Sequence, residues 1–446
     1  MTGVGEIGEI FAWQALDSRG SPTVAVEVTL GGGAVGTAIV PSGASTGRHE
    51  ARELRDGGDR YAGRGVQRAV ANAAGELAAA VRGLDSVDQV SVDTALRRAD
   101  GTADLSRLGA NAVLALSVAT ARAAADMSGQ PLYRFVDRGD GEQFLLPMPM
   151  VNIISGGAHA ARAVDVQDFL VVPVGADTFT SAMEIAWRIR AATAQVAGEE
   201  GLNVALVADE GGLGPVLPSN RHALELLAAG VERAGYQLGT DAAFAIDVAA
   251  TQFHDPVNNR YHLAAEDRTV QAAELVAEFA KWCEDFPIIS IEDVLAEDDW
   301  GGWTEAATVL GNIQLMGDDL FCTNVARLNR GIEENAANAV LVKPNQVGTL
   351  SDARAVVDLA SRSGMATVLS ARSGETEDDW LADLSIGWRT GQIKVGSTMR
   401  SERTAKWNRL LGIEARLGEA AVFAGTSGLA PLRTATPRST ALRGMG

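Results

Sequence analysis

Ionisable side chains follow a series of short apolar segments in the second half of the chain. Each segment is rich in β-branched residues, and the polar residues that come at or just after their ends are Asp247, Glu292, Asp318, Lys343, Arg372 with Ser373, and Lys394. The intervals between them are close to the length of one or two strand–helix units. Parallel strands connected in that way bring their carboxyl ends to one face, where catalytic groups gather. We therefore expect these side chains to converge.

Three of these residues, Asp247, Glu292 and Asp318, carry carboxylates. Three carboxylates held together repel one another strongly unless a cation lies between them. Hard oxygen ligands with room for water suit Mg²⁺. For any one of the three the alternative is a helix N-cap or a solvated loop acid. Taken together they favour a magnesium site.

Two lysines and one arginine–serine pair add cationic groups to the same predicted face. Lys343 and Lys394 follow or lie in apolar segments. A partly desolvated lysine beside cations has a lowered pKa and can act as a base, although an ion pair with the carboxylates is the alternative role. Arg372 and Ser373 offer a guanidinium and a hydroxyl next to a glycine, which suits a grip on phosphate.

A metal, a lysine base and a phosphate grip together indicate removal of a proton next to a carboxylate. A second group must then protonate whatever leaves the next carbon. Glu210 is the candidate acid, because the glycines that follow it let the backbone approach a ligand closely. An ordinary polar turn is the alternative. His159, in the glycine-containing stretch 155–159, is a candidate for assisting from a loop, although a lone histidine is more often structural.

The elements that must position these groups alternate between short strands and amphipathic helices from about residue 145. The clearer predicted strands are Phe244–Asp247, Ile288–Glu292, Ile313–Gly317, Val340–Lys343, Ala366–Ser370 and Gln392–Val395. So many units in this length of chain favour an α/β fold with a closed (β/α)₈-type barrel. The stretch 150–215 is less regular, so we expect the barrel to begin unconventionally.

The first 140 residues have a different pattern. Apolar residues alternate over 24–30, a glycine turn follows, and a second apolar stretch covers 34–40, which predicts a hairpin. Helical spacing then covers roughly 63–82, 86–98 and 107–128. We expect an α+β N-terminal capping domain over 1–140, a catalytic barrel over 141–431 and a loose tail over 432–446.

Composition excludes several classes of protein. The 446 residues contain 38 Lys+Arg against 57 Asp+Glu, a net charge of −19, so neither nucleic acid nor an anionic membrane is an expected partner. The 2 cysteines indicate a reducing compartment. No signal peptide and no apolar run long enough to span a membrane is visible, so we expect a cytoplasmic protein.

Seven stretches carry a resemblance to a known family over nearly the whole chain. They are Leu16–Gly20, Pro41–Gly47, Asp209–Gly212, Ser290–Asp293, Gly317–Leu320, Arg372–Asp378 and Arg400–Arg403. On these motifs the chain resembles enolase, the phosphopyruvate hydratase family. The resemblance implies an N-terminal domain capping a barrel, two Mg²⁺ ions, a small anionic substrate and a homodimer or higher homo-oligomer.

The resemblance also implies a role for individual residues. The matching positions are Asp247, Glu292 and Asp318 as ligands of the tighter metal, Ser45 as a contributor to the second metal, Lys343 as the base, Glu210 as the acid, Lys394 as the partner of the substrate carboxylate and the metal, and Arg372 with Ser373 as the phosphate grip. These roles agree with those argued from spacing.

The chain departs from the family pattern at several positions. Ala371 stands where a histidine is usual, and Asp168 stands where a glutamate is usual, which withdraws that carboxylate by about one methylene. Ser155 replaces a usual asparagine, Pro344 follows the base, and Val294 stands where proline is common. Changes of this kind beside a retained set of metal ligands and lysines indicate altered substrate handling.

Two enzymatic interpretations follow. We expect a specialised relative, such as a carboxyphosphonoenolpyruvate synthase of phosphonate antibiotic biosynthesis, which would take a nucleotide-activated phosphonate because Ala371 leaves room beside the phosphate. The alternative is an ordinary glycolytic enolase that interconverts 2-phosphoglycerate and phosphoenolpyruvate. A third interpretation, a non-catalytic binding protein, is disfavoured by the retained Lys343, Lys394 and Glu210.

Overall fold

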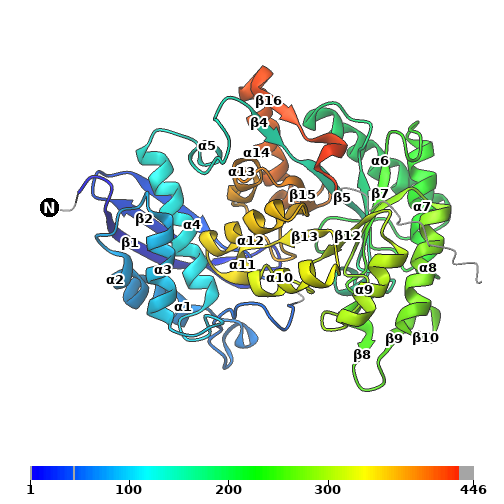
Figure 1. Cartoon of the computed structure of the whole chain (residues 1–446), viewed down its shortest axis with the longest axis horizontal. Coiled ribbons are helices and arrows are strands. Elements are labelled where there is room, and N and C mark those ends of the chain that lie inside the picture. Colours follow the sequence, from blue (N-terminus) through cyan, green and yellow to red (C-terminus); the bar gives the residue numbers. More distant parts are fainter. Residues whose placement is uncertain (1–2, 44–45, 431–446) are drawn as a thin grey trace, which may run out of the picture.

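The computed structural model describes residues 3–43 and 46–430 of the chain. An N-terminal part of strands and helices lies beside a larger barrel, as Figure 1 shows from blue and cyan through to red. Ser45 and the predicted tail over 432–446 lie outside the described residues.

The N-terminal part is a three-stranded antiparallel meander covered by helices. Its strands, in the order β1-β2-β3, are β1 (Ile7–Leu16), β2 (Pro22–Leu30) and β3 (Val35–Ile39). Its helices are α1 (Gln67–Asn72), which continues through a π-helical turn into α2 (Ala78–Val81), α3 (Gln89–Asp100), α4 (Ala110–Met127) and the short α5 (Leu132–Phe135). The predicted hairpin and the three predicted helical segments are confirmed.

Helix α4 is rich in alanine because the sheet lies directly against it. A Cβ added to Gly36 of β3 would lie 2.1 Å from the carbonyl oxygen of Ala119. Only a glycine lets strand and helix approach this closely.

Eight strands form the barrel, closed in the order β11-β12-β13-β14-β15-β5-β6-β7. Their bounds are β5 (Met148–Ser155), β6 (Asp168–Val172), β7 (Ala243–Asp247), β11 (Ile288–Glu292), β12 (Gln314–Gly317), β13 (Ala339–Val342), β14 (Ala366–Ser370) and β15 (Gly391–Gly396). The α/β barrel and the α+β part before it are therefore as expected, and each of the six predicted strands agrees within one residue.

Helices surround the barrel and short extra strands decorate it. The helices are α6 (Phe179–Glu199), α7 (Asn220–Arg233), α8 (Ala272–Asp285), α9 (Trp300–Val309), α10 (Val325–Glu334), α11 (Pro344–Val347), α12 (Leu350–Arg362), α13 (Trp380–Gly387) and α14 (Ser401–Leu417). The extra strands are β4 (Phe144–Leu146) paired with β16 (Ala421–Phe423), and the small sheet of β8 (His254–Asp255), β9 (Arg260–Leu263) and β10 (Arg268–Val270). Within the described residues, no helix is both long and apolar enough to cross a membrane.

Strand β6 gives the barrel its unconventional start. It pairs antiparallel with β5 on one side and with β7 on the other, whereas the other neighbouring strands pair in parallel. Because β6 runs in the opposite direction, its first residue, Asp168, pairs with Ser155 and Asp247 at the last residues of β5 and β7. This reversal brings Asp168 to the mouth where the parallel strands end.

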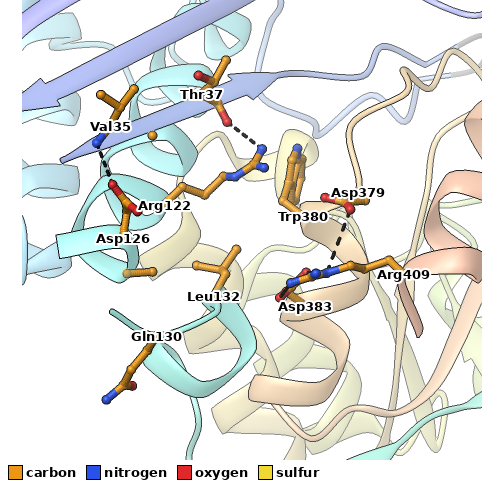
Figure 2. Close-up of a pocket in the computed structure, with 12 residues that line it drawn as sticks. Val35, Thr37, Arg122, Asp126, Gln130, Leu132, Asp379, Trp380, Asp383 and Arg409 are labelled. Carbon is orange, nitrogen blue, oxygen red and sulfur yellow. Dashed lines mark hydrogen bonds and ion pairs between the residues drawn. The ribbon is translucent and has the colours of Figure 1, made fainter. Parts of the chain in front are cut away.

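Side chains, and not another strand, satisfy the outer edge of β3 where the N-terminal part meets the barrel. The N–H of Val35 donates to Asp126 at 3.0 Å, Arg122 donates to the carbonyl of Thr37 at 2.6 Å, and the N–H of Ile39 donates to Asp378 at 2.9 Å. Figure 2 shows the first two contacts at a cavity of about 380 Å³ between β3, α4 and α13. These bonds close an edge that would otherwise be open to pairing with another strand.

Candidate active site

The carboxyl ends of the barrel strands bring together the side chains that the sequence singled out. Asp247 and Glu292 are the last residues of β7 and β11, and Asp318 follows β12 directly. Lys343 follows β13, and Lys394 lies within β15. The predicted convergence is therefore seen in the structure.

Lysine ammonium groups pair with the three carboxylates in two sets of ion pairs, which together form a largely buried charged network. Lys394 Nζ lies 2.6 Å from Asp247 Oδ2 and 2.7 Å from Glu292 Oε2, and the three side chains are 6%, 3% and 2% exposed. Lys343 Nζ lies 2.5 Å from Asp318 Oδ2. The backbone N–H groups of Asp318 and Asp319 donate to the Asp293 carboxylate, which holds the turn after β12 in place.

The network has fewer cations than carboxylates. Burial, followed by the charge of Asp247, holds the pKa of Glu292 well above its usual range. Glu292 Oε1 is also buried without a hydrogen-bond partner among the described residues. A hard divalent cation would satisfy this oxygen and balance the charge, so Asp247, Glu292 and Asp318 fit Mg²⁺.

A second acidic group lies beside the first. Oxygen atoms of Asp293, Asp318 and Asp319 lie within 4.8 Å of one another, close enough to share an ion. The second predicted contributor, Ser45, lies outside the described residues, so its place relative to this group stays a prediction.

The expected lowering of the Lys343 pKa is wrong for the protein without a bound cation. Burial disfavours the ammonium, but the charges of the neighbouring carboxylates, chiefly Asp318 and then Glu292, together outweigh burial and raise the pKa of Lys343. The neighbouring Arg372 acts in the opposite direction without reversing the result. Lys343 is therefore an ammonium in this state and must lose its proton before it can serve as a base.

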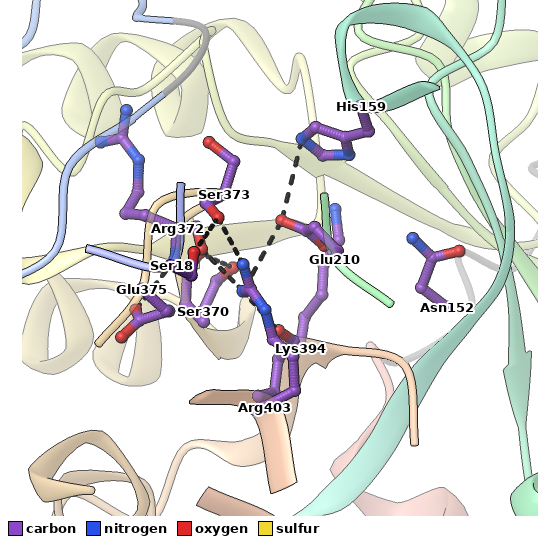
Figure 3. Close-up of polar contacts among 12 residues, drawn as sticks. Ser18, Asn152, His159, Glu210, Ser370, Arg372, Ser373, Glu375, Lys394 and Arg403 are labelled. Atoms are coloured by element: carbon purple, nitrogen blue, oxygen red, sulfur yellow. Dashed lines mark hydrogen bonds and ion pairs between the residues drawn. The ribbon is translucent and has the colours of Figure 1, made fainter. Parts of the chain in front are cut away.

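Glu210, His159 and Asp168 form a second buried array at the same mouth. His159 Nδ1 lies 2.9 Å from Asp168 Oδ2. His159 Nε2 lies 3.8 Å from Glu210 Oε1, and this second contact is drawn in Figure 3. The other Asp168 oxygen accepts from Ser155 Oγ at 3.0 Å and from the Asn152 amide. Both carboxylate oxygens of Asp168 therefore have hydrogen-bond partners, and Ser155 provides one of the donors.

Electrostatics assign charges within this array. Burial opposes charging of the imidazole, but Asp168 and Glu210 raise the pKa of His159 to about 9. Burial also opposes ionisation of Glu210, but His159 and Arg403 outweigh it and lower the pKa of that carboxyl. Burial raises the pKa of Asp168, although the charge of His159 opposes that shift. The imidazolium thus lies between Asp168 and the Glu210 carboxylate, so Glu210 must gain a proton before it can act as an acid.

A tight turn places Glu210. A Cβ on Gly211, whose φ is 87°, would lie 2.5 Å from the Met399 carbonyl oxygen, so only glycine fits there. The Glu210 carbonyl accepts from the Ser397 N–H at 2.8 Å, and Arg190 donates to the Gly211 carbonyl at 2.9 Å. Gly211 therefore lets this turn pack against the backbone at Met399, and the predicted close approach to a ligand stays a prediction.

The predicted phosphate grip follows β14 and is held by a buried arginine. Arg403 donates to the carbonyl oxygens of Arg372 at 2.7 Å, Ser373 at 2.5 Å and Val395 at 2.9 Å, and it lies 3.9 Å from Glu210 Oε1. Figure 3 shows Arg403 between the Arg372–Ser373 segment and Glu210. Ala371 is 5% exposed and donates its N–H to the Lys394 carbonyl at 2.9 Å.

Sequence reasoning missed several polar residues that hold the site together. Gln167 donates to Asp247 at 3.0 Å, and Gln346 donates to Asp318 at 2.8 Å. Glu50, from the N-terminal part, pairs with Arg372 at 2.9 Å. Glu50 lies only three residues beyond the matched stretch that ends at Gly47, so an extended motif could have revealed it, whereas the amides carry no spacing signal.

Together the groups can abstract a proton and assist a leaving group. The mouth contains two lysines, a carboxylate–imidazolium array and a guanidinium, with carboxylates suited to a divalent cation. Such a set suits an anionic substrate whose carbon acid is deprotonated and whose leaving group is protonated.

Comparison with known proteins points to one family. Residues 143–431 match the model described as enolase, C-terminal TIM barrel domain, and residues 7–136 match enolase, N-terminal domain. A curated protein named Enolase from Rubrobacter xylanophilus is 50% identical over 428 residues, which cover 96% of this chain and 98% of that protein.

Proposed function

The chain belongs to the enolase family of Mg²⁺-dependent lyases, and on this premise we propose that it is an ordinary glycolytic enolase. The reaction is the interconversion of 2-phosphoglycerate with phosphoenolpyruvate and water. The observation that carries the proposal is the 50% identity to a curated Enolase over almost the full length of both chains. The buried network of Lys343, Lys394 and the three carboxylates supports it.

In the proposed mechanism the two ends of the substrate are held by different groups. Arg372 and Ser373 bind the phosphate, and Arg403 fixes the backbone carbonyls of both residues. The Lys394 ammonium lies among carboxylates at the barrel mouth and pairs with the substrate carboxylate. When bound, Mg²⁺ at Asp247, Glu292 and Asp318 balances their charge and stabilises the negative charge that develops on that carboxylate.

Proton transfers complete the proposed reaction. Lys343, once neutral, takes the proton from the carbon next to the carboxylate. Glu210, once protonated, gives its proton to the departing hydroxide, and His159 at 3.8 Å is a charged neighbour able to supply that proton. The roles of these residues, two bound Mg²⁺ ions, a homo-oligomer and a cytoplasmic location belong to the proposal.

The specialised phosphonate reaction is the second candidate. The buried Ala371, in place of a usual histidine, is the observation in its favour. The high identity to a curated Enolase favours the ordinary reaction instead, and a nucleotide-activated substrate has no support from the comparisons.

One assay separates the two candidates. Purified protein is incubated with 2-phosphoglycerate and Mg²⁺, and phosphoenolpyruvate formation is followed by its ultraviolet absorbance, beside a known enolase and an EDTA control. Turnover within about tenfold of the known enolase, abolished by EDTA, supports the ordinary reaction. A tenfold difference in rate corresponds to only about 1.4 kcal/mol in activation free energy. A rate lower by about 10³ or more would overturn it and favour the specialised substrate.

A further inference from the structure

Glu50 is a residue of the N-terminal part whose side chain reaches into the barrel mouth. It lies beyond β3, and its side chain is 7% exposed. Glu50 Oε2 lies 2.9 Å from Arg372 Nη1, and Oε1 lies 3.4 Å from Arg372 Nη2, so the carboxylate meets the guanidinium side-on. An arginine–carboxylate pair of this kind fixes direction as well as distance.

The same carboxylate has two further contacts. Gly47 donates its N–H to Glu50 Oε1 at 2.9 Å, and Gln346 donates to that oxygen at 3.4 Å. Gln346 also donates to Asp318 Oδ1 at 2.8 Å. Glu50 is therefore bonded both to the proposed phosphate grip and to the amide that holds a proposed metal ligand.

Besides Glu50, the Arg372 guanidinium contacts the side chain of Asn345. Its side chain is 4% exposed, and its Nη1 also donates to Asn345 Oδ1 at 3.1 Å. Burial disfavours the guanidinium charge, but Glu50 raises the pKa of Arg372. A buried arginine with a long side chain has several rotamers, and a two-point contact with a fixed acid selects one of them.

We propose that Glu50 is a positioning residue for the reaction, which orients Arg372 toward the substrate phosphate and couples that orientation to Asp318 through Gln346. The inference rests on the proposed function. It assigns to the N-terminal part a share in substrate binding that does not require contact between Glu50 and the substrate. Nothing in the spacing of the barrel residues indicates it.

The charge of Glu50 and its orienting contact with Arg372 predict opposite effects on phosphate binding when Glu50 is replaced, so a substitution can distinguish them. By Coulomb's law alone, neutralising an acid beside a phosphate site should tighten phosphate binding. If Glu50 orients Arg372, Glu50→Gln should weaken binding because the amide cannot hold the guanidinium through two acceptor oxygens. The two explanations therefore differ in the sign of the effect.

Glu53→Gln is the matched control. Glu53 lies three residues away, pairs with Arg55 at 2.5 Å, and also contributes to the field that acts on Arg372. The control removes the same charge from the same segment without breaking the contact with Arg372.

The experiment measures kcat and KM for 2-phosphoglycerate, and the Kd of phosphoenolpyruvate by calorimetry, all with saturating Mg²⁺. For Glu50→Gln and Glu50→Ala we expect KM and Kd to rise about fivefold to thirtyfold, as for loss of one charge-assisted contact, while kcat changes less than threefold. Glu53→Gln should leave both constants within about twofold.

Binding unchanged or tightened in both Glu50 variants would overturn the inference. So would a fall in kcat at constant KM. Thermal melting checks folding, and Glu50→Gln retains the shape of the side chain if Glu50→Ala fails to fold. If the wild-type protein does not turn over 2-phosphoglycerate, the proposed function fails. In that case the Kd of inorganic phosphate, measured by calorimetry for the wild type, Glu50→Gln and Glu53→Gln, still decides the role of Glu50.

Discussion

Lys343 meets two opposing demands, since it must be neutral to accept a proton and it lies against a carboxylate that keeps it charged. Its ion pair with Asp318 at 2.5 Å raises the lysine pKa. Anything that draws the Asp318 charge away lowers that pKa again. The resting protein therefore keeps its proposed base protonated until the site is loaded.

Replacing the base should remove proton abstraction and leave the fold intact. For Lys343→Met we expect the rate of α-proton exchange of 2-phosphoglycerate in D₂O, followed by NMR, to fall by about 10³ or more. Lys281→Met is the control, because Lys281 is 61% exposed on α8 and should have unchanged exchange. Exchange at the wild-type rate in Lys343→Met would assign the base elsewhere.

His159 should make stability depend on pH. Its pKa is about 9 in the folded protein and about 6.5 when unfolded, so the imidazolium contributes stability that is complete below pH 6.5 and is lost as the pH rises through 9. We expect urea unfolding in EDTA to show the wild-type advantage over His159→Gln shrinking across this window. An advantage that is constant from pH 6 to pH 10 would contradict the assignment.

Residues at strand ends could be found from the sequence, and residues that support them could not. Lys394 and Asp247 follow or end apolar segments, so their convergence was predictable. Gln346 donates to Asp318 and Glu50 through its side-chain amide, and Gln252 accepts from the Ala158 N–H. No periodicity identifies amides of that kind. The direction of the Lys343 pKa could not be predicted, because it depends on the balance between burial and the charges that the fold brings close to the ammonium.

At the scale of elements, the reversal of β6 is the feature that the sequence did not specify. The irregular stretch 150–215 was recognised as unusual, but strand direction depends on pairing with β5 and β7. Strand β1 was also missed. Its residues Phe11 and Leu16 are 59% and 52% exposed, so the strand lacks the clear alternation that identified β2.

The contact between β3 and α4 makes a prediction about packing. Gly36→Ala would place a methyl group 2.1 Å from the Ala119 oxygen and 2.2 Å from the Ala123 nitrogen, both of them backbone atoms that cannot rotate away. We expect a loss of about 3 kcal/mol or more in the free energy of unfolding, measured in urea. Gly75→Ala, whose added Cβ has no atom within 4 Å, should be neutral or slightly stabilising. Equal stability of the two variants would contradict this packing.

At the scale of the whole molecule, negative charge is concentrated at the barrel mouth, where burial makes ionised carboxylates energetically unfavourable. The chain carries a net charge of −19, and several of its acids are buried together at the barrel mouth. Ion pairs join the two parts, among them Glu50 with Arg372 at the barrel mouth and Arg122 with Asp378 beside β3. Loading the site with a cation should therefore stabilise the whole chain and not the barrel alone.

Magnesium should raise the melting temperature in proportion to the logarithm of its concentration. A cation that binds only the folded state adds about 2.7 kcal/mol at one hundred times its Kd. Burial and Asp247 hold the pKa of Glu292 high in the metal-free protein, and its Oε1 has no hydrogen-bond partner among the described residues. A bound cation should therefore stabilise the ionised form of this carboxylate.

Differential scanning fluorimetry across a Mg²⁺ titration should show the rise in melting temperature in the wild type and a much smaller rise in Glu292→Gln. Glu284→Gln, whose side chain is 71% exposed on α8, should behave as the wild type. A full shift in Glu292→Gln would place the stabilising ion outside the network of Asp247, Glu292 and Asp318.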